Sequence, residues 1–320
     1  MSTGVLPVVA VLEAFDGPMQ ATIRAHAGDG VTLVFAASNT DADRVAALAD
    51  ADYAVVRGVR MAPALLDHAP RLRLLHQWGT GTDFLPVAQA LARGVVVARS
   101  PGRNAPTIAD LTMGLMLACL RGIPRSDTRV RAGQWADEGQ WVTGRDLTGA
   151  RVGLVGYGAI AQGVARRLSG FDCAVVYTRQ SGPMDGAPGH LPLAALLASV
   201  DVLSLHVPLT PATRSMIGAA ELALMQRGAV LINTARGGIV DEAALAAALT
   251  SGQIGAAGID AFDTEPMTAD NPLLSAPNTV LSPHVAGRTR DNLRRMVQHW
   301  AANIRAHAAG QALDPGDLVT

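Results

Sequence analysis

The stretch that decides the fold prediction is "RVGLVGYGAIAQGVARRL" (residues 151–168), in which a glycine turn joins an apolar strand to an amphipathic helix. It meets the pattern G-x-G-x-x-G/A with Gly156, Gly158 and Ala161. Gly156 permits a tight turn, Gly158 lets the backbone approach a pyrophosphate, and Ala161 allows close helix–strand packing. The free N–H groups at the start of the helix then face the anion. The stretch therefore predicts a dinucleotide-binding βαβ unit.

The next predicted strand bears on which dinucleotide binds. It ends in "VVYTRQ" (175–180), and Arg179 stands where NAD-binding chains usually carry an acidic residue for the ribose 2′-OH. A guanidinium there would grip a 2′-phosphate, with Thr178 and Ser181 as additional hydroxyl donors. NADP(H) is therefore favoured. NAD(H) stays open, because Arg179 could instead point to solvent or stack on the adenine.

Length and composition restrict the class of protein. A chain of 320 residues is long for one hydrophobic core and suits two domains. With 49% hydrophobic residues and a net charge of −1, it shows no charge excess for a nucleic acid or an anionic membrane surface. All 26 basic residues are arginine, which excludes Schiff-base and phosphate-loop lysines.

The two cysteines and the apolar runs bear on compartment. Cys119 and Cys173 have no metal-ligand neighbours, so we expect two free buried thiols and no metal site. The first residues lack the basic segment and apolar core of a secretory signal. The apolar runs fall short of the roughly 20 residues that span a bilayer. A soluble, cytoplasmic protein with no membrane partner is therefore expected.

Short β-rich runs alternate with Ala/Leu-rich helical segments along the whole chain, which predicts an α/β fold with parallel sheets. The expected strands of a first series are 6–14, 31–37, 51–58, 72–79 and 94–100. Those of a second series are 151–156, 173–178, 200–207, 228–234, 255–262 and 279–284. A buried helix is expected over 105–123 and a last helix over 290–310.

Three of the later segments place polar side chains near the carboxyl ends of strands, where α/β folds bind ligands. Arg236 lies in "INTARGGIVDEAAL", Glu265 in "GIDAFDTEP" and His284 in "SPHVAG". One arginine, one glutamate and one histidine are the parts needed to transfer a hydride to a 2-keto acid.

These segments, in this order, closely resemble the D-isomer-specific 2-hydroxyacid dehydrogenase family. The resemblance covers nearly the whole chain. The motifs that carry it are "GTGTD" (79–83), "NAPTIADLTMGLMLACLR" (104–121), "GQW" (133–135), "LTGARVGLVGYG" (147–158), "HVPLTPAT" (206–213), "NTARGGIVDE" (233–242), "DAFDTEP" (260–266) and "SPHVAG" (282–287). It implies a Rossmann dinucleotide-binding domain (103–289) inserted in a discontinuous, flavodoxin-like substrate domain (1–102 plus 290–320).

The resemblance also implies catalytic roles. His284 resembles the family's acid/base, which protonates the keto oxygen as hydride arrives from the nicotinamide. Glu265 resembles its partner, because a carboxylate at hydrogen-bond distance favours imidazolium and fixes the tautomer. Arg236 resembles the anchor of the substrate carboxylate and carbonyl oxygen, a role that suits a fixed fork of donors.

Further residues are expected to contact the ligands. Asp260 resembles the residue that orients the nicotinamide carboxamide, and the loop Gly79–Gly81 resembles the one that holds the substrate carboxylate. The expected cofactor contacts are Thr107, Gly156, Tyr157, Gly158, Ala159, Ile160, Thr178, Arg179, Ser181, His206, Val207, Pro208, Thr213, Thr234, Ala235, Arg236, Asp260, His284, Ala286 and Gly287. The expected substrate contacts are Arg57, Trp78, Gly79, Thr80, Gly81, Arg236 and His284.

Several alternatives stay open. Trp78 is unusually bulky before the glycines, and it either narrows the pocket or packs behind it. Arg57 and Arg60 either serve a substrate phosphate or are solvated surface charges. The favoured activity is reduction of a small 2-keto acid such as glyoxylate or hydroxypyruvate. The alternatives are 3-phosphoglycerate oxidation and a dinucleotide-sensing, corepressor-like binding protein. The resemblance also implies a homodimer, with Trp135 and Trp141 in its interface.

Overall fold

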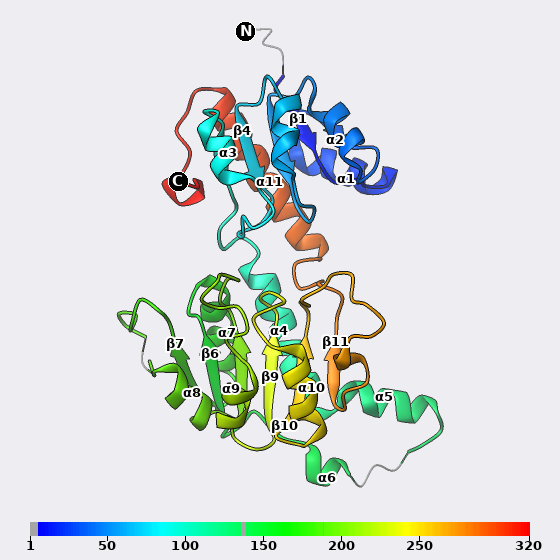
Figure 1. Ribbon diagram of the computed structural model, residues 1–320, viewed down its shortest axis with the longest axis vertical. Coiled ribbons are helices and arrows are strands. Elements are labelled where there is room, and N and C mark those ends of the chain that lie inside the picture. Colours follow the sequence, from blue (N-terminus) through cyan, green and yellow to red (C-terminus); the bar gives the residue numbers. More distant parts are fainter. Residues whose placement is uncertain (1–5, 136–138, 188) are drawn as a thin grey trace. The chain divides into compact units, whose positions relative to one another are not determined.

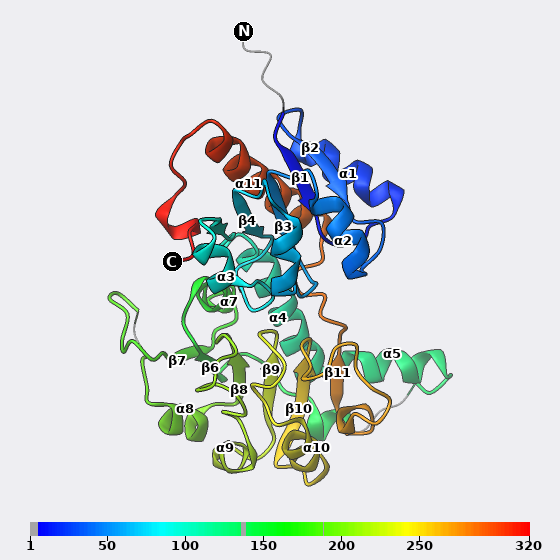
Figure 2. The ribbon, with the colours of Figure 1, turned by 45° about the horizontal axis from the view of Figure 1, so that its top comes forward.

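The computed structural model describes residues 6–135, 139–187 and 189–320, and it folds into two compact units. The first unit comprises the chain up to Asn104 together with Arg288–Thr320, and the second comprises Ala105–Gly287. Each unit is built on one parallel sheet (Figures 1 and 2). The predicted α/β fold class is confirmed.

The first unit contains a five-stranded sheet in the order β2-β1-β3-β4-β5, which is the flavodoxin-like order. Its strands are β1 (Val8–Val11), β2 (Thr32–Phe35), β3 (Tyr53–Val56), β4 (Leu74–Gln77) and β5 (Val96–Ala98). Its helices are α1 (Gly17–Ala27), α2 (Asp41–Leu48), α3 (Val87–Ala92) and α11 (Arg290–Ala308), with 3-10 turns η1 (Pro63–His68) and η3 (Pro315–Asp317).

Side chains alternate between the two faces of this sheet. Helices cover both faces, so the strand residues are buried on both sides, as is usual for a parallel sheet. Val9, Val11, Tyr53, Val55 and Leu74 pack with α1 and α11. Ala10, Leu12, Ala54, Val56 and Leu75 pack on the other side with α2, η1 and α3. The strands therefore read as continuous apolar runs, which is why the sequence reveals them.

The second unit contains a six-stranded sheet in the order β11-β10-β9-β8-β6-β7. Its strands are β6 (Arg151–Val155), β7 (Ala174–Thr178), β8 (Val202–Leu205), β9 (Ala229–Asn233), β10 (Ile254–Ile259) and β11 (Thr279–Leu281). Its helices are α4 (Ala105–Arg121), α5 (Ile123–Arg131), α6 (Gln140–Thr143), α7 (Ala159–Leu168), α8 (Leu193–Ser199), α9 (Ala219–Leu224) and α10 (Glu242–Thr250), with a 3-10 turn η2 (Pro272–Leu274). The strand order reverses at β6, between β7 and β8.

Helices cover both faces of the second sheet. Residues of α4 and α7 share a core with one face, and residues of α8, α9 and α10 share a core with the other. The α4 helix packs so closely that a Cβ at Gly258 of β10 would lie 3.0 Å from the Leu115 Cβ. By contrast, α5 lies away from the sheet in both views (Figures 1 and 2).

The described cysteines and helices bear on two further expectations. Cys119 and Cys173 are free, as predicted, but both residues are only partly buried where full burial was expected. Burial raises the pKa of the Cys119 thiol to about 12. Across 6–135, 139–187 and 189–320, no single helix has the length and apolar character to cross a membrane; α4 and α5 meet that test only as a pair, bent by 62°.

A buried polar network ties α11 and the C-terminal segment to the first sheet. The fully buried His76 ring lies at its centre. His76 Nδ1 donates to the Gln77 carbonyl (2.7 Å), and the Asn303 amide donates to His76 Nε2 (3.1 Å) and to Asp317 Oδ2 (3.0 Å). His299 Nε2 lies 2.9 Å from the same Asp317 oxygen. Because an amide donor faces Nε2, the imidazole of His76 is neutral, and burial lowers its pKa to about 4.

We expect this histidine to make the protein less stable in mild acid. Unfolded His76 takes up a proton near pH 6.5, whereas folded His76 does so only near pH 4. Its contribution to stability is therefore complete above pH 6.5 and is lost as the pH falls towards 4. Between these values His76→Asn should reduce the pH dependence of the unfolding free energy by up to about 1.4 kcal/mol per pH unit.

The measurement is the thermal midpoint between pH 7.5 and pH 5 for the wild type, His76→Asn and a control, His68→Asn, in which an exposed histidine is replaced. Other histidines with lowered pKa values keep part of the slope in every variant. An identical slope for His76→Asn and the wild type would contradict the assignment.

Candidate active site

The glycine turn of the second unit lies between β6 and α7 and has the shape of an anion site. Gly156 has φ +86°, and a Cβ there would lie 2.7 Å from the His206 carbonyl oxygen, so only glycine fits. Gly158 is the N-cap of α7, makes no side-chain cap, and has no atom within 4 Å of a Cβ built on it. The described residues thus leave space beside the backbone at the start of α7, which suits a dinucleotide diphosphate.

The turn lies at the point where the strand order reverses. β6 and β8 are neighbours, and their carboxyl ends carry Gly156 and His206. A parallel α/β sheet binds its ligand at such a switch point. His206 Nε2 lies 3.0 Å from Ser204 Oγ, and burial lowers the pKa of its ring to about 3. This ring is therefore neutral near pH 7, and the predicted cofactor stretch 206–208 lies beside the glycine turn.

Arg179 directly follows β7, the edge strand beside β6. Its Nε donates to Ser181 Oγ (2.6 Å), so the guanidinium and the hydroxyl lie together. Among the residues that the structure describes, no carboxylate pairs with Arg179. Thr178 is occupied differently: its carbonyl accepts from the Gly156 amide (2.9 Å). The pair Arg179–Ser181 is thus a donor group open to an anion.

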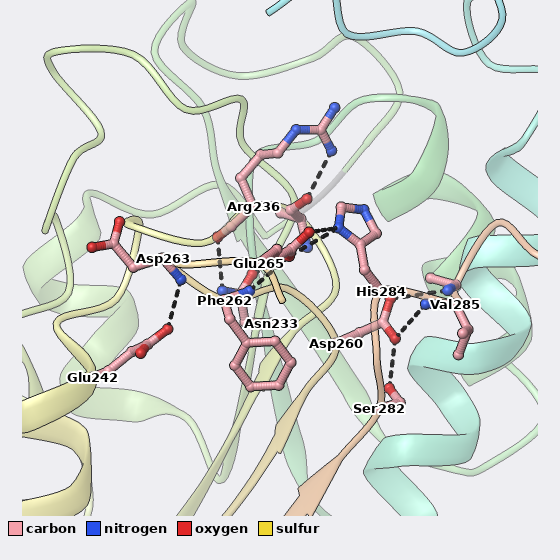
Figure 3. A network of polar contacts seen from close by, with 12 residues as sticks. Asn233, Arg236, Glu242, Asp260, Phe262, Asp263, Glu265, Ser282, His284 and Val285 are labelled. Carbon is pink, nitrogen blue, oxygen red and sulfur yellow. Dashed lines mark hydrogen bonds and ion pairs between the residues drawn. The ribbon is translucent and has the colours of Figure 1, made fainter. Parts of the chain in front are cut away.

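At the other side of the sheet, Asp260 holds the segment that carries His284 (Figure 3). The Asp260 side chain follows β10 and is only 1% exposed. Its Oδ1 accepts from Ser282 Oγ (2.5 Å) and the Val285 amide (2.9 Å), and its Oδ2 accepts from the Ala286 amide (2.9 Å). The structure therefore gives Asp260 a positioning role within the chain, and its predicted carboxamide contact stays a prediction.

The His284 imidazole and the Glu265 carboxylate lie within ion-pair distance of each other. His284 Nδ1 lies 2.9 Å and 2.7 Å from the two Glu265 carboxylate oxygens. The Phe262 amide donates to Glu265 Oε1 (3.0 Å) and so holds the carboxylate in place. Since Nδ1 must carry a proton to bind a carboxylate, Nε2 is the ring atom left for chemistry. His284 Nε2 has no hydrogen-bond partner among the described residues, and both side chains are more than a third exposed.

Arg236 lies in the turn that follows β9. The Asn233 side chain shapes that turn, because its Nδ2 donates to the Arg236 carbonyl (2.9 Å) and its Oδ1 accepts from the Ala235 amide (3.1 Å). Arg236 Nη1 donates to the Ala235 carbonyl (2.8 Å). Figure 3 shows Arg236, Glu265 and His284 gathered where β9, β10 and β11 end. The three predicted catalytic side chains thus come together in one unit.

The turns after β9 and β10 touch directly at a glycine. A Cβ added to Gly237 would lie only 1.8 Å from the Phe262 carbonyl oxygen. Glu242, at the start of α10, reinforces this contact by accepting from the Asp263 amide (2.8 Å) and from Asn271 Nδ2 (2.6 Å). Asn233, Gly237, Phe262 and Glu242 are functional-site residues that the sequence alone does not single out. The paired glycines of "ARGG" are a signal from which a close backbone approach could have been predicted.

Two predicted cofactor threonines have hydroxyls that are already engaged. Thr112 Oγ1 donates to the Ile108 carbonyl (2.8 Å), so Thr234 Oγ1 donates to Thr112 Oγ1 (2.9 Å) and ties the end of β9 to α4. Thr213 Oγ1 donates to the Pro208 carbonyl (2.6 Å). These hydroxyls shape the surrounding backbone. Any cofactor contact of Thr234 or Thr213 stays a prediction.

The predicted substrate residues of the first unit follow β3 and β4. The Gly79 carbonyl accepts from the Ser100 amide (2.9 Å), and Thr80 Oγ1 donates to the Ser100 carbonyl (3.2 Å). Trp78 is 5% exposed, and its ring centre lies 5.8 Å from that of Trp300, so it packs behind the loop. This matches the second of the two alternatives for Trp78. Arg57 is not a free surface charge, because Glu13 binds its guanidinium at two points.

The exposed arm α5–α6 carries Trp135 and Trp141, which are 87% and 91% exposed. No group of three or more His, Cys, Asp and Glu side chains in the described ranges is arranged to hold a metal ion. What the second unit offers is a phosphate-binding turn, an oriented imidazole and a nearby guanidinium. Those groups can bind a dinucleotide, protonate an oxygen and neutralise a carboxylate.

Comparison with known proteins agrees with this geometry. The family model described as "D-isomer specific 2-hydroxyacid dehydrogenase, NAD binding domain" matches residues 113–286, more than half of the chain. A glyoxylate reductase of Korarchaeum cryptofilum is 38% identical over 261 residues, which cover 80% of this chain and 78% of that protein. A D-3-phosphoglycerate dehydrogenase of Mycobacterium tuberculosis is 36% identical over 312 residues, which cover 96% of this chain and 58% of that protein.

A solved structure is similar over both units. It is the NADPH-dependent glyoxylate/hydroxypyruvate reductase of Sinorhizobium meliloti in complex with NADP and malonate, with a TM-score of 0.84 and 31% identity. The similarity covers 99% of this chain and 97% of that chain.

The contact between the turns after β9 and β10 generates a prediction. Gly237→Ala places a methyl group against the Phe262 carbonyl, so the two turns must separate. We expect the free energy of unfolding to fall by about 1–3 kcal/mol, as for other overpacked sites. The measurement is the urea midpoint. Gly170→Ala is the control, because its Cβ would meet only the Arg167 carbonyl at 3.8 Å. Equal midpoints for Gly237→Ala and Gly170→Ala would show that the contact is not restrictive.

Proposed function

The chain belongs to the D-isomer specific 2-hydroxyacid dehydrogenase family and is an oxidoreductase that uses a nicotinamide dinucleotide, and from this premise we propose that it reduces a small 2-keto acid to its D-2-hydroxy acid, with NADPH preferred. Glyoxylate and hydroxypyruvate are the favoured substrates, because relatives named for these activities match both units. The observation that carries the proposal is the His284–Glu265 pair with Nε2 left open.

The proposed chemistry divides into roles for named side chains. A reduced dinucleotide held at the glycine turn of Gly156 and Gly158 would supply the hydride for the keto carbon. His284 Nε2 delivers the proton that the keto oxygen takes up, and Glu265 stabilises the ring before and after that transfer. Arg236 neutralises the substrate carboxylate with its fork of N–H donors. The loop Gly79–Gly81 is the part of the first unit that we propose for the same carboxylate. In the oxidative direction His284 accepts the proton.

The cofactor preference rests on Arg179. Its guanidinium lies beside the Ser181 hydroxyl at the end of β7, on the strand next to the glycine turn. Such a pair of donors suits a 2′-phosphate. The position at which NAD-binding chains carry an acidic residue for the ribose 2′-hydroxyl holds Arg179 instead. The similar reductase of S. meliloti was solved with NADP.

Assembly and location complete the proposal. We propose a homodimer, because Trp135, Trp141 and Val142 expose large apolar surfaces on the arm α5–α6. We also propose a cytoplasmic location, supported by the two free thiols.

The activity proposal predicts a rate that depends on His284. Wild-type protein should oxidise NADPH in the presence of glyoxylate or hydroxypyruvate, and His284→Ala should lower kcat by about 10²–10⁴-fold, the range for loss of a general acid. Glu265→Gln should lower kcat less, since the amide keeps the ring in place without the charge. Initial rates at 340 nm, with NADPH binding followed separately by fluorescence, measure both effects. Binding without turnover in the wild type would favour the dinucleotide-sensing alternative.

Cofactor choice gives an independent prediction. We expect kcat/KM at least tenfold higher with NADPH than with NADH, which corresponds to about 1.4 kcal/mol. Arg179→Ala should remove that preference by raising the KM for NADPH while leaving NADH kinetics nearly unchanged. Arg151→Ala is the matched control, because Arg151 is an exposed arginine at the start of β6. Equal efficiency of the two cofactors in the wild type would refute the role of Arg179 and keep the activity.

A further inference from the structure

Three neighbouring strands of the first unit end at one edge of its sheet. β1, β3 and β4 lie side by side, and because they are parallel their carboxyl ends share that edge. Glu13 follows β1, Arg57 follows β3, and the loop Gly79–Gly81 follows β4. Arg57 therefore lies at the same end of the sheet as the proposed carboxylate-binding loop, directly after the strand next to β4.

The Glu13 carboxylate already forms an ion pair with the Arg57 guanidinium. Arg57 Nε donates to Glu13 Oε2 and Arg57 Nη2 donates to Glu13 Oε1, both over 2.6 Å, which is the parallel two-point geometry of the strongest arginine–carboxylate pairs. The Arg57 guanidinium carbon lies 5.2 Å from the centre of the Phe15 ring, so an aromatic face fixes the group from a further side. The Glu13 side chain is 15% exposed and that of Arg57 is 32% exposed, so solvent screens the pair only in part.

The pair changes what this edge can bind. A free guanidinium at this place would attract a phosphate on the substrate, as the sequence suggested. Paired with Glu13, the group has no net charge, and its Nε and one Nη2 proton are already used. A phosphate that reached Arg57 would either displace a two-point carboxylate or lie beside a like charge, and both are unfavourable. Arg60, the other candidate for a phosphate, lies over the Phe84 ring at 5.7 Å and is exposed.

We propose that Glu13 is a specificity-determining residue that, by holding Arg57 in a two-point pair, selects unphosphorylated small 2-keto acids against their phosphorylated counterparts. This inference rests on the proposed 2-keto acid reductase function and names its substrate class. It separates the favoured activity from 3-phosphoglycerate oxidation, the activity for which a similar relative is named.

The test compares kcat/KM for hydroxypyruvate and for 3-phosphohydroxypyruvate, with NADPH, in the wild type, Glu13→Gln, Glu13→Ala and the double variant Glu13→Gln/Arg57→Gln. The wild type should favour hydroxypyruvate. Each single variant should raise the phosphorylated-to-unphosphorylated ratio at least tenfold, mainly through a lower KM for the phosphorylated acid. The double variant should return the ratio to the wild-type value or below, because the freed cation is then absent.

Asp67→Asn is the matched control, because it also removes one carboxylate from an arginine pair of this unit, the exposed pair with Arg93 before β5. It should leave the ratio unchanged. Calorimetry with 3-phosphoglycerate gives the same comparison without turnover: Glu13→Gln should bind it at least tenfold more tightly than the wild type. A folded Glu13→Gln with an unchanged ratio and an unchanged dissociation constant overturns the inference.

Failure of the proposed function looks different. In that case the wild type reduces neither keto acid, while the calorimetric comparison still decides the role of Glu13. A wild type that prefers the phosphorylated acid overturns the inference and leaves the dehydrogenase chemistry standing.

Discussion

The buried carboxylate of Asp260 is the group on which the geometry of the site depends. A charged carboxylate that is almost completely removed from water is costly unless donors surround it. Here the donors all come from the segment that follows β11: one hydroxyl and two backbone amides between Ser282 and Ala286. The carboxylate is therefore satisfied only when that segment is in place. The same requirement holds His284 at φ +50°, a left-handed conformation that non-glycine residues seldom adopt.

The other site residues are positioned by short contacts between the turns that follow β9 and β10. Glu265 reaches His284 because the Phe262 amide holds its carboxylate, and Phe262 is held because Gly237 lets the neighbouring turn approach its carbonyl. Arg236 precedes that glycine, and Asn233 closes its turn. Each catalytic candidate is thus positioned by hydrogen bonds within and between the turns after β9, β10 and β11, with no metal group or disulfide among the described residues.

Much of this arrangement is predictable from the sequence, and the part that is not has a physical cause. Strands buried on both faces give continuous apolar runs, so all eleven expected strands appear within the described residues, with ends that differ by a few positions. The glycine turn, Arg236, Glu265 and His284 stand at strand ends, and both the apolar strand pattern and the local sequence motif indicate these positions. Trp78 was ambiguous because adjacent residues point to opposite faces of a sheet, and only packing against Trp300 shows which face it takes. The Glu13–Arg57 pair joins residues 44 apart through side-chain geometry that no local pattern encodes.

The network around His76 has a consequence for how the chain can be handled. Asp317 lies under His299 and Asn303, Leu318 forms an antiparallel bridge with Ala98, and the Val319 amide donates to the Val97 carbonyl. The segment thus covers the outer edge of β5, which would otherwise present unpaired backbone groups to other molecules. Removing these last residues in a shortened variant would expose that edge and leave His299 and Asn303 without the Asp317 carboxylate. Such a variant should self-associate, and an affinity tag is better placed at the other terminus.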